Sequence, residues 1–128
     1  MRYLAVLSLS ILLTGCFLHP SDCSRFRNGN FKAMVNGRPY IVERNGSFQK
    51  EYLLGSRDSM LMTFTVTWLN DYTYTLRPTP ATLKKYPKIK PGEMVTVEII
   101  HTTPKTYTVR AARSIWEWAF VEEFTKTD

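Results

Sequence analysis

Two neighbouring segments of the chain alternate between apolar and polar side chains, and this period of two constrains the fold more than any other feature. Threonine or arginine fills the alternate positions, and the apolar members are Met62, Phe64, Val66 and Trp68 in the first segment and Tyr72, Tyr74 and Leu76 in the second. Successive side chains of a β-strand point to opposite faces, so each segment predicts a strand with one apolar face. Asn70 and Asp71 between the segments are typical of a tight turn, which predicts a hairpin whose aromatic side chains share one face.

The remaining turns and strands follow from the same pattern. Asn36-Gly37 and Asn45-Gly46 are dipeptides that fit type I′ turns, and each lies between alternating runs. Residues 81–86 follow a proline and stop at Pro87, which predicts one short helical turn. The predicted strands cover residues 26–35, 40–44, 48–54, 60–68, 72–77, 94–101, 106–110 and a last strand with Trp116, Trp118 and Phe120 on one face.

The strands follow one another through short turns, without alternating helices. This order predicts an all-β fold, an antiparallel meander of seven to eight strands. A meander whose edge strands meet forms a small closed barrel, calycin-like, which removes the exposed edges that invite aggregation; a partly open barrel is the alternative. With eight strands the interior is wide enough for side chains or for one small ligand.

Composition limits the class of protein. The chain has 128 residues, of which 44% are hydrophobic, and only two cysteines. These values predict one domain with its own core, and they exclude a collagen-like or disordered chain and a small disulfide-built scaffold. The formal charge of +6 favours anionic partners.

The N-terminus predicts export and a lipid anchor. A basic start at Arg2 precedes an apolar run that is shorter than the roughly 20 residues of a membrane-spanning helix. The run ends in Leu13-Thr14-Gly15-Cys16, which resembles the bacterial lipobox, where the cysteine after the cleavage site carries diacylglycerol. An ordinary secretory signal with an accidental cysteine is the alternative. We predict a lipoprotein signal peptide over residues 1–15, a lipidated tether over residues 16–22 beginning at Cys16, and a single barrel-like domain over residues 23–128.

The residue after the anchor cysteine bears on location. Phe17 stands where aspartate would signal inner-membrane retention in some Gram-negative bacteria. We therefore expect a lipid-anchored protein of the cell envelope, in the outer membrane and facing the periplasm. Export also removes nucleic acid as a partner, although small barrels with basic grooves can bind single strands.

A family resemblance spans most of the chain after the tether. It is carried by residues 23–31 (CSRFRNGNF), Glu43-Arg44, residues 49–52 (QKEY) and residues 64–76 (FTVTWLNDYTYTL). These segments resemble a family of small lipoproteins from Bacteroidetes-type bacteria, of uncharacterised function, whose members are sometimes labelled DNA topoisomerase. The chain lacks the size and the metal-binding cluster for that chemistry. The family pattern implies a second cysteine where this chain has Tyr72, paired with the one matching Cys23, so Cys23 is left here as an odd thiol.

Few residues offer catalytic or metal-binding chemistry. His19 lies in the tether and His101 ends a predicted strand, which nearly excludes a histidine metal site. No HExxH, CxxC, GxSxG or GxGxxG motif is present. Glu122 and Glu123 are neighbours on a strand and point to opposite faces, so they cannot act on one bond. We expect no enzyme, no catalytic residue, no metal and no cofactor.

Aromatic residues are the candidates for a ligand pocket. Tryptophan and tyrosine offer flat apolar area with a polar end, which suits a binding cavity. Their spacing also suits plain core packing, and a domain of this size must bury most of its large side chains to be stable. The candidate pocket-lining residues are Trp68, Tyr72, Tyr74, Trp116 and Trp118.

A basic segment is the second candidate site. Lys84, Lys85, Lys88 and Lys90 fall within seven residues, with an aromatic residue and prolines among them. We predict contact with an anionic envelope component, namely a lipid headgroup, lipopolysaccharide or peptidoglycan, because each lysine adds about 1 kcal/mol at an anionic surface. A solvated loop is the alternative.

Together these features predict an envelope-anchored lipoprotein that acts as a non-catalytic binding or structural module, with an envelope protein as a further partner. The alternatives are a carrier of a small hydrophobic ligand and a barrel that resembles a periplasmic lysozyme inhibitor. Lysozymes are usually cationic, so a basic inhibitor would meet like charge.

Overall fold

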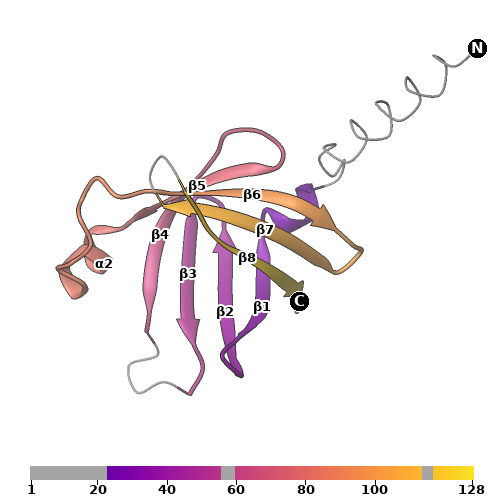
Figure 1. The fold of residues 1–128 in the computed structure, drawn as a ribbon, viewed down its shortest axis with the longest axis horizontal. Helices are drawn as coiled ribbons and strands as arrows, with labels where there is room; N and C mark the ends of the chain where they lie inside the picture. Colours follow the sequence, from indigo (N-terminus) through magenta and orange to yellow (C-terminus); the bar gives the residue numbers. More distant parts are fainter. Residues whose placement is uncertain (1–22, 56–59, 114–116) are drawn as a thin grey trace, which may run out of the picture.

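The protein is a closed, eight-stranded antiparallel barrel in which each strand pairs with its sequence neighbours (Figure 1). The computed structural model describes residues 23–55, 60–113 and 117–128. β1 and β8 close the barrel through the Cα pairs Phe31–Lys126 and Lys32–Thr125. The predicted meander and its closure are therefore confirmed. The strands are β1 (Gly29–Val35), β2 (Arg38–Asn45), β3 (Phe48–Leu53), β4 (Met62–Trp68), β5 (Thr73–Pro78), β6 (Val95–Thr102), β7 (Thr106–Arg113) and β8 (Glu117–Lys126).

The two Asn-Gly dipeptides form different turns. Asn36 and Gly37 both have positive φ, 51° and 76°, as a type I′ turn requires, so that prediction is confirmed. Asn45 instead ends β2 and pairs with Phe48, which leaves Gly46 and Ser47 as the turn. Gly46 has φ 61° at the first central position, as in a type II′ turn, so the type I′ prediction is wrong there.

The beginning of the first predicted strand is also wrong. Ser24–Phe26 forms a short 3-10 helix, η1, and β1 begins only at Gly29. The side chain of Phe26 is fully buried, because η1 turns it towards the barrel interior. The predicted last strand is present as β8, and Trp116 lies outside the described residues.

A short helix, α2 (Pro80–Lys85), joins β5 to β6 and confirms the predicted helical turn. Its N-cap is Thr79, whose hydroxyl accepts a hydrogen bond from the Thr82 amide, and Pro80 occupies the first helical position, where no amide is needed. The helix stops at Tyr86, before Pro87.

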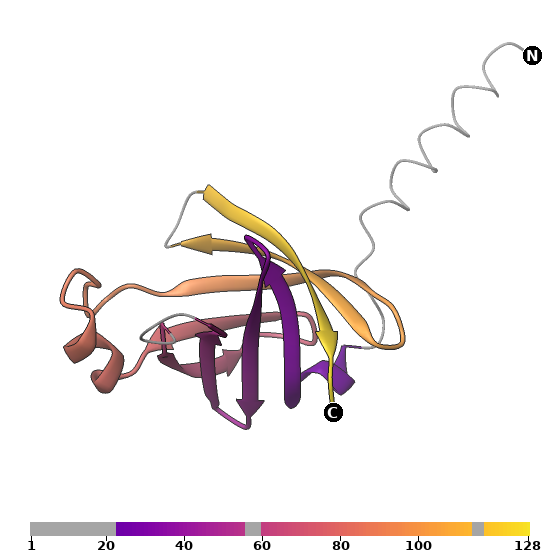
Figure 2. The ribbon, with the colours of Figure 1, turned by 90° about the horizontal axis from the view of Figure 1, so that it is seen from below.

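The barrel has two distinct ends, which Figure 2 shows on opposite sides of the molecule. One end carries η1, the C-terminus and the turns that join β2 to β3, β4 to β5 and β6 to β7. The other end carries the β1–β2 turn and the connection from β5 through α2 to β6. We call them the closed end and the open end.

Alternate residues of the strands fill the barrel interior. The buried apolar set is Cys23, Phe26, Phe31, Ala33, Val42, Phe64, Val66, Tyr74, Leu76, Val97, Ile99, Tyr107, Val109, Ala111 and Phe124. The β4–β5 hairpin has the predicted face, since Val66 pairs with Leu76 and Trp68 with Tyr74, all on the interior side. In the described part of the chain, no helix has the length and apolar character needed to cross a bilayer.

Candidate functional site

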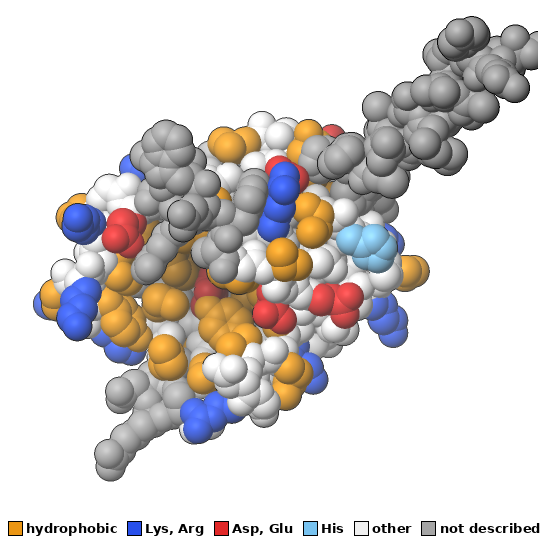
Figure 3. All heavy atoms as spheres, in the orientation of Figure 1, with side chains coloured by type: hydrophobic (Ala, Val, Ile, Leu, Met, Phe, Trp, Pro, Cys, Tyr) orange, Lys and Arg blue, Asp and Glu red, His pale blue; other side chains and the backbone are white. Residues whose placement is uncertain are grey.

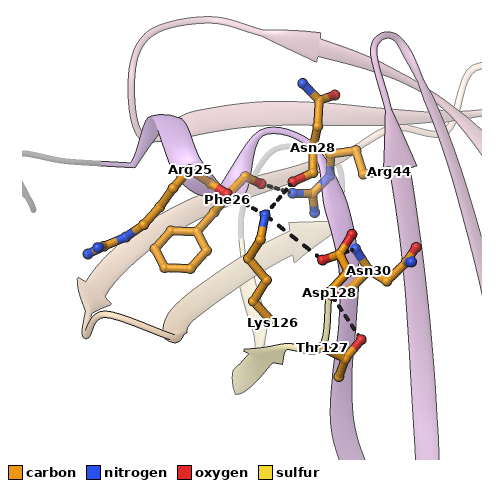
Figure 4. Close-up of polar contacts among 8 residues, drawn as sticks. All are labelled: Arg25, Phe26, Asn28, Asn30, Arg44, Lys126, Thr127 and Asp128. Atoms are coloured by element: carbon orange, nitrogen blue, oxygen red, sulfur yellow. Dashed lines mark hydrogen bonds and ion pairs between the residues drawn. The ribbon is translucent and has the colours of Figure 1, made fainter.

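The closed end is sealed by η1 and held by the last strand (Figure 4). The Phe26 ring lies 5.0 Å from the Tyr107 ring, centroid to centroid, and covers the barrel interior. Lys126 Nζ donates hydrogen bonds to the carbonyl oxygens of Arg25, at 3.0 Å, and Asn28, at 3.1 Å. A charged group on β8 therefore holds the backbone on either side of Phe26. We call η1 with the buried Phe26 ring the plug.

A buried arginine forms the floor above the plug. Arg44 is 2% exposed and projects from β2 into the interior. Its Nη1 donates to the Phe26 carbonyl at 2.6 Å, and its Nη2 donates to the hydroxyls of Tyr74 at 2.9 Å and Tyr107 at 3.2 Å. Nε donates to Gln49 Oε1 at 2.7 Å. Four bonds thus engage four of the five donors of a guanidinium.

The charge of Arg44 is kept in this environment. Burial lowers the pKa of the guanidinium, but Tyr74, Tyr107 and Glu51 raise it more, and the net direction is upward. Burial raises the pKa of the Tyr74 and Tyr107 phenols, so both remain protonated and accept from Arg44. The floor is therefore a fixed cation surrounded by aromatic rings, with the Tyr74 ring centroid 4.6 Å from the guanidinium.

A carboxylate continues the network up one wall. Gln49 Nε2 donates to Glu51 Oε2 at 2.6 Å, and the Tyr40 hydroxyl donates to Glu51 Oε1. Burial raises the pKa of the Glu51 carboxyl, and this outweighs the lowering by its two hydrogen bonds and by Arg44. Burial and the neighbouring Glu51 also raise the pKa of Tyr40. The wall therefore presents a buried acid that titrates above its usual range.

Above this floor the barrel encloses a cavity of about 550 Å³. Its wall is mainly apolar, and Figure 3 shows hydrophobic side chains around a hollow with an acidic side chain among them. Phe120, 51% exposed, lies at the opening. The apolar members are Val35, Val42, Met62, Phe64, Leu76, Pro78, Ile89, Met94, Val95, Val97, Val109, Ala111, Phe120 and Phe124.

Charged groups in the described lining are mostly acidic. Glu51 from β3, Glu122 from β8 and Glu93 from the segment between α2 and β6 supply three carboxylates, against the single guanidinium of Arg44. Glu122 shares the interior face of β8 with Phe120 and Phe124, whereas Glu123 is exposed. The interior thus differs in sign from the chain as a whole, which is basic.

Only some of the predicted pocket residues line the cavity. Tyr74 lines the cavity floor, whereas Trp68 and Tyr72 pack against the core outside the cavity lining. Trp68 lies under Arg27, whose guanidinium is 4.7 Å from the ring centroid. Trp116 is outside the described residues, and Trp118 lies on β8 with its side chain also outside the description.

The basic segment lies beside the opening. Its four lysines, Lys84, Lys85, Lys88 and Lys90, are exposed, and Ile89 and Glu93 from the same stretch line the cavity. The segment is at the open end, opposite η1. Cys16, the predicted lipidation site, lies outside the described residues, and the chain enters the barrel at the closed end through Cys23, which is 2% exposed.

Sequence reasoning missed the polar floor and the acidic wall. Arg44, Gln49 and Glu51 are hydrophilic residues on strand faces that turn inward, and an apolar pattern cannot single them out. In the described ranges, no group of three or more histidine, cysteine, aspartate or glutamate side chains could hold a metal ion. What the arrangement offers is an enclosed apolar volume with fixed polar groups at its base and side, the pattern of a small-molecule binding site.

Comparison with known proteins supports the architecture. The structure is similar to pallilysin of Treponema pallidum, with a TM-score of 0.51, 13% sequence identity, and coverage of 95% of this chain and 98% of that one. At this identity the likeness shows a shared barrel fold. No family model and no curated protein matches the sequence.

Proposed function

We propose that the protein is a non-catalytic, lipid-anchored binding module of the bacterial envelope that holds a small hydrophobic molecule inside its barrel. The cavity carries this proposal. At about 550 Å³ it falls within the range of roughly 300 to 1,000 Å³ that small-molecule sites occupy, and its wall is apolar with a few fixed polar groups. A barrel of this strand number has room for one such ligand.

The anchor is supported by the sequence before the barrel. Cys16 follows a signal-like segment, and the six residues 17–22 separate it from the barrel. Six extended residues span at most about 20 Å, so an acylated Cys16 would keep the closed end near its membrane. The opening would then face away from that membrane, towards the periplasm in the outer-membrane location that we propose.

The basic segment supports a second role as a contact with an anionic envelope component. Four exposed lysines beside the opening would attract an anionic surface, at about 1 kcal/mol each. Since they lie opposite the chain entry, the surface they meet would be a different one from the membrane that holds the anchor, such as peptidoglycan or a facing bilayer.

The binding role is tested by filling the cavity. Ala111 lines the cavity and is fully buried, whereas its neighbour Ala112 is outside the lining. With the lipidated protein in detergent, the apolar probe N-phenylnaphthylamine should fluoresce more strongly than in the same detergent without protein. Ala111→Phe should weaken probe binding about tenfold or more, and Ala112→Phe should leave it unchanged.

Two results would contradict this proposal. Absence of probe binding to the wild-type protein would mean that the interior does not accept apolar molecules. Equal binding to both alanine variants would mean that the probe sits on the surface. Native mass spectrometry of protein purified gently from the envelope fraction would reveal a co-purified ligand by its additional mass.

A further inference from the structure

The charged groups of the described cavity lining are mainly negative, whereas the chain as a whole is positively charged. The chain is formally +6, yet the described cavity lining holds Glu51, Glu93 and Glu122 against one arginine. Glu51 and Glu122 lie on β3 and β8, three strands apart around the barrel, and both side chains face the same interior. A ligand that enters this space meets acidic groups on two sides.

The one cation in the described part of the lining is already engaged by the protein. Arg44 is 2% exposed, and its donors bond to the Phe26 carbonyl, Gln49 and two tyrosine hydroxyls. Only one of its five N–H groups is left outside these four bonds. A ligand carboxylate would need to break this network to reach the guanidinium, and it would also approach Glu51, a like charge.

Two of the carboxylates, Glu51 and Glu122, retain capacity to accept hydrogen bonds. Glu51 accepts two, from Tyr40 and Gln49, whereas a carboxylate has about four lone-pair sites. The carboxylate of Glu122 forms no hydrogen bond or ion pair with any residue that the structure describes, although its backbone pairs with Val109 in the sheet. An ammonium group has three donors and no acceptor, so it complements this set of groups.

Resting on the proposed binding function, we infer that the cavity selects an amphiphile with a cationic, amine-type headgroup over a fatty acid or a neutral lipid of the same length. The hydrocarbon part would lie against the apolar wall, and the ammonium would bond to Glu122 and Glu51. Burial raises the pKa of Glu51 more than its hydrogen bonds and Arg44 lower it, so a bound ammonium beside Glu51 would favour its ionised form.

The test uses three ligands that share one hydrocarbon chain: dodecylamine, dodecanol and dodecanoate. Each competes with N-phenylnaphthylamine for the lipidated protein in detergent at neutral pH. Dodecylamine should displace the probe at about one-tenth of the dodecanol concentration, since one hydrogen bond to a charged group contributes about 1.5 kcal/mol. Dodecanoate should be the weakest competitor.

Two adjacent glutamates on β8 provide the matched variants. Glu122→Gln should lower the apparent affinity for dodecylamine about tenfold and leave dodecanol unchanged. Glu123→Gln, which removes the same charge from the exposed face, should change neither. Glu51→Gln should lower dodecylamine affinity in the same direction as Glu122→Gln. Unchanged probe affinity in each variant shows that the barrel is folded.

Other outcomes separate the headgroup inference from the binding function. If dodecanoate competes best, or if Glu122→Gln and Glu123→Gln affect dodecylamine equally, the inference is overturned while the binding function stands. If the probe itself does not bind to the wild-type protein, the binding function fails and the inference fails with it.

Discussion

The closed and open ends of the barrel are built from the same eight strands but differ in how their interiors are satisfied. At the closed end, Phe26 fills the bore and Arg44 joins η1, β3, β5 and β7 through hydrogen bonds. At the open end, hydrogen bonds among Thr63, Thr79 and Thr82 join β4 to α2, and Phe120 is half exposed beside the cavity. One end is thus a sealed base and the other is an accessible apolar space.

This difference assigns stability and binding to separate regions. A buried polar network is costly unless its atoms have hydrogen-bond partners, and each guanidinium nitrogen of Arg44 has at least one. A binding cavity needs the opposite, which is apolar surface that the protein leaves unfilled. We therefore expect substitutions at the closed end to change the free energy of unfolding, and substitutions at the open end to change binding.

The largest expected effect is the loss of the buried arginine. Arg44→Leu should lower the free energy of unfolding by about 3–5 kcal/mol, because it leaves the Phe26 carbonyl and buried side-chain oxygens without their donor. Arg38 lies on the same strand at the open end and is exposed. Arg38→Leu is the matched control and should stay within about 0.5 kcal/mol. Urea denaturation followed by circular dichroism measures both, and equal losses would contradict the difference between the ends.

A smaller effect is expected at the clamp on the plug. Lys126→Met removes two charged hydrogen bonds to the backbone around η1 and should lower the free energy of unfolding by about 1–2 kcal/mol, given that the side chain is partly exposed. The buried thiol of Cys23 should then react faster with a maleimide, since it lies next to η1. Peptide mass spectrometry locates the label. Lys105→Met, an exposed lysine at the same end, is the control, and equal labelling in both variants would mean that Lys126 does not hold the plug.

The dependence of stability on pH tests the acidic wall. Because burial raises the pKa of Glu51 in the folded state, its contribution to stability is complete below the usual glutamate pKa of about 4.3 and is lost as pH rises through the raised value. Glu51→Gln removes this contribution, so the unfolding free energy of the variant should fall less than that of the wild type as pH rises from about 4 towards neutrality. Glu123→Gln is the control for loss of one surface charge. Parallel curves for wild type and Glu51→Gln would show that folding does not raise the pKa of Glu51.

The sequence was sufficient to predict the barrel, because turn chemistry and alternation are local properties. The β4–β5 hairpin is an example, since Thr65 and Thr67 point outward and Phe64 and Val66 point inward, as the period of two requires. The strand pattern left a closed and a partly open barrel as alternatives, and the pairing of β1 with β8 closes it. Turn type was less certain, as Asn45 shows by pairing with Phe48 within the ladder.

The site could not be predicted in the same way, because β3 reverses the usual pattern. Phe48 is 48% exposed while the next residue, Gln49, is 2% exposed. Hydrophobicity would place the phenylalanine inside, but Gln49 and Glu51 are turned inward by hydrogen bonds to partners on β2, Arg44 and Tyr40. These pairs form between two strands, so the hydrophobic pattern within one strand does not reveal them. Whether a barrel retains a cavity depends likewise on side-chain volumes summed over all eight strands.

The smallest expected effect on stability lies in the basic segment. This segment also tests whether the anchor and the lysines lie at opposite ends of the barrel. Replacing Lys84, Lys85, Lys88 and Lys90 by glutamine should change the free energy of unfolding by no more than about 0.5 kcal/mol, since all four are exposed. The lipidated protein in neutral vesicles should cluster added anionic vesicles, because its anchor and its lysines are at opposite ends, and light scattering measures the clustering.

The quadruple variant should lose this clustering, since four contacts of about 1 kcal/mol each supply the attraction. A control that replaces the exposed residues Lys32 and Lys105, which lie outside the basic segment, should retain it. A second preparation places the lipidated protein in anionic vesicles. If the lysines bind to these vesicles and no clustering occurs, the open end bends back to the membrane that holds the anchor. The lysines would then act beside the anchor, and the two ends of the barrel would face one surface and not two.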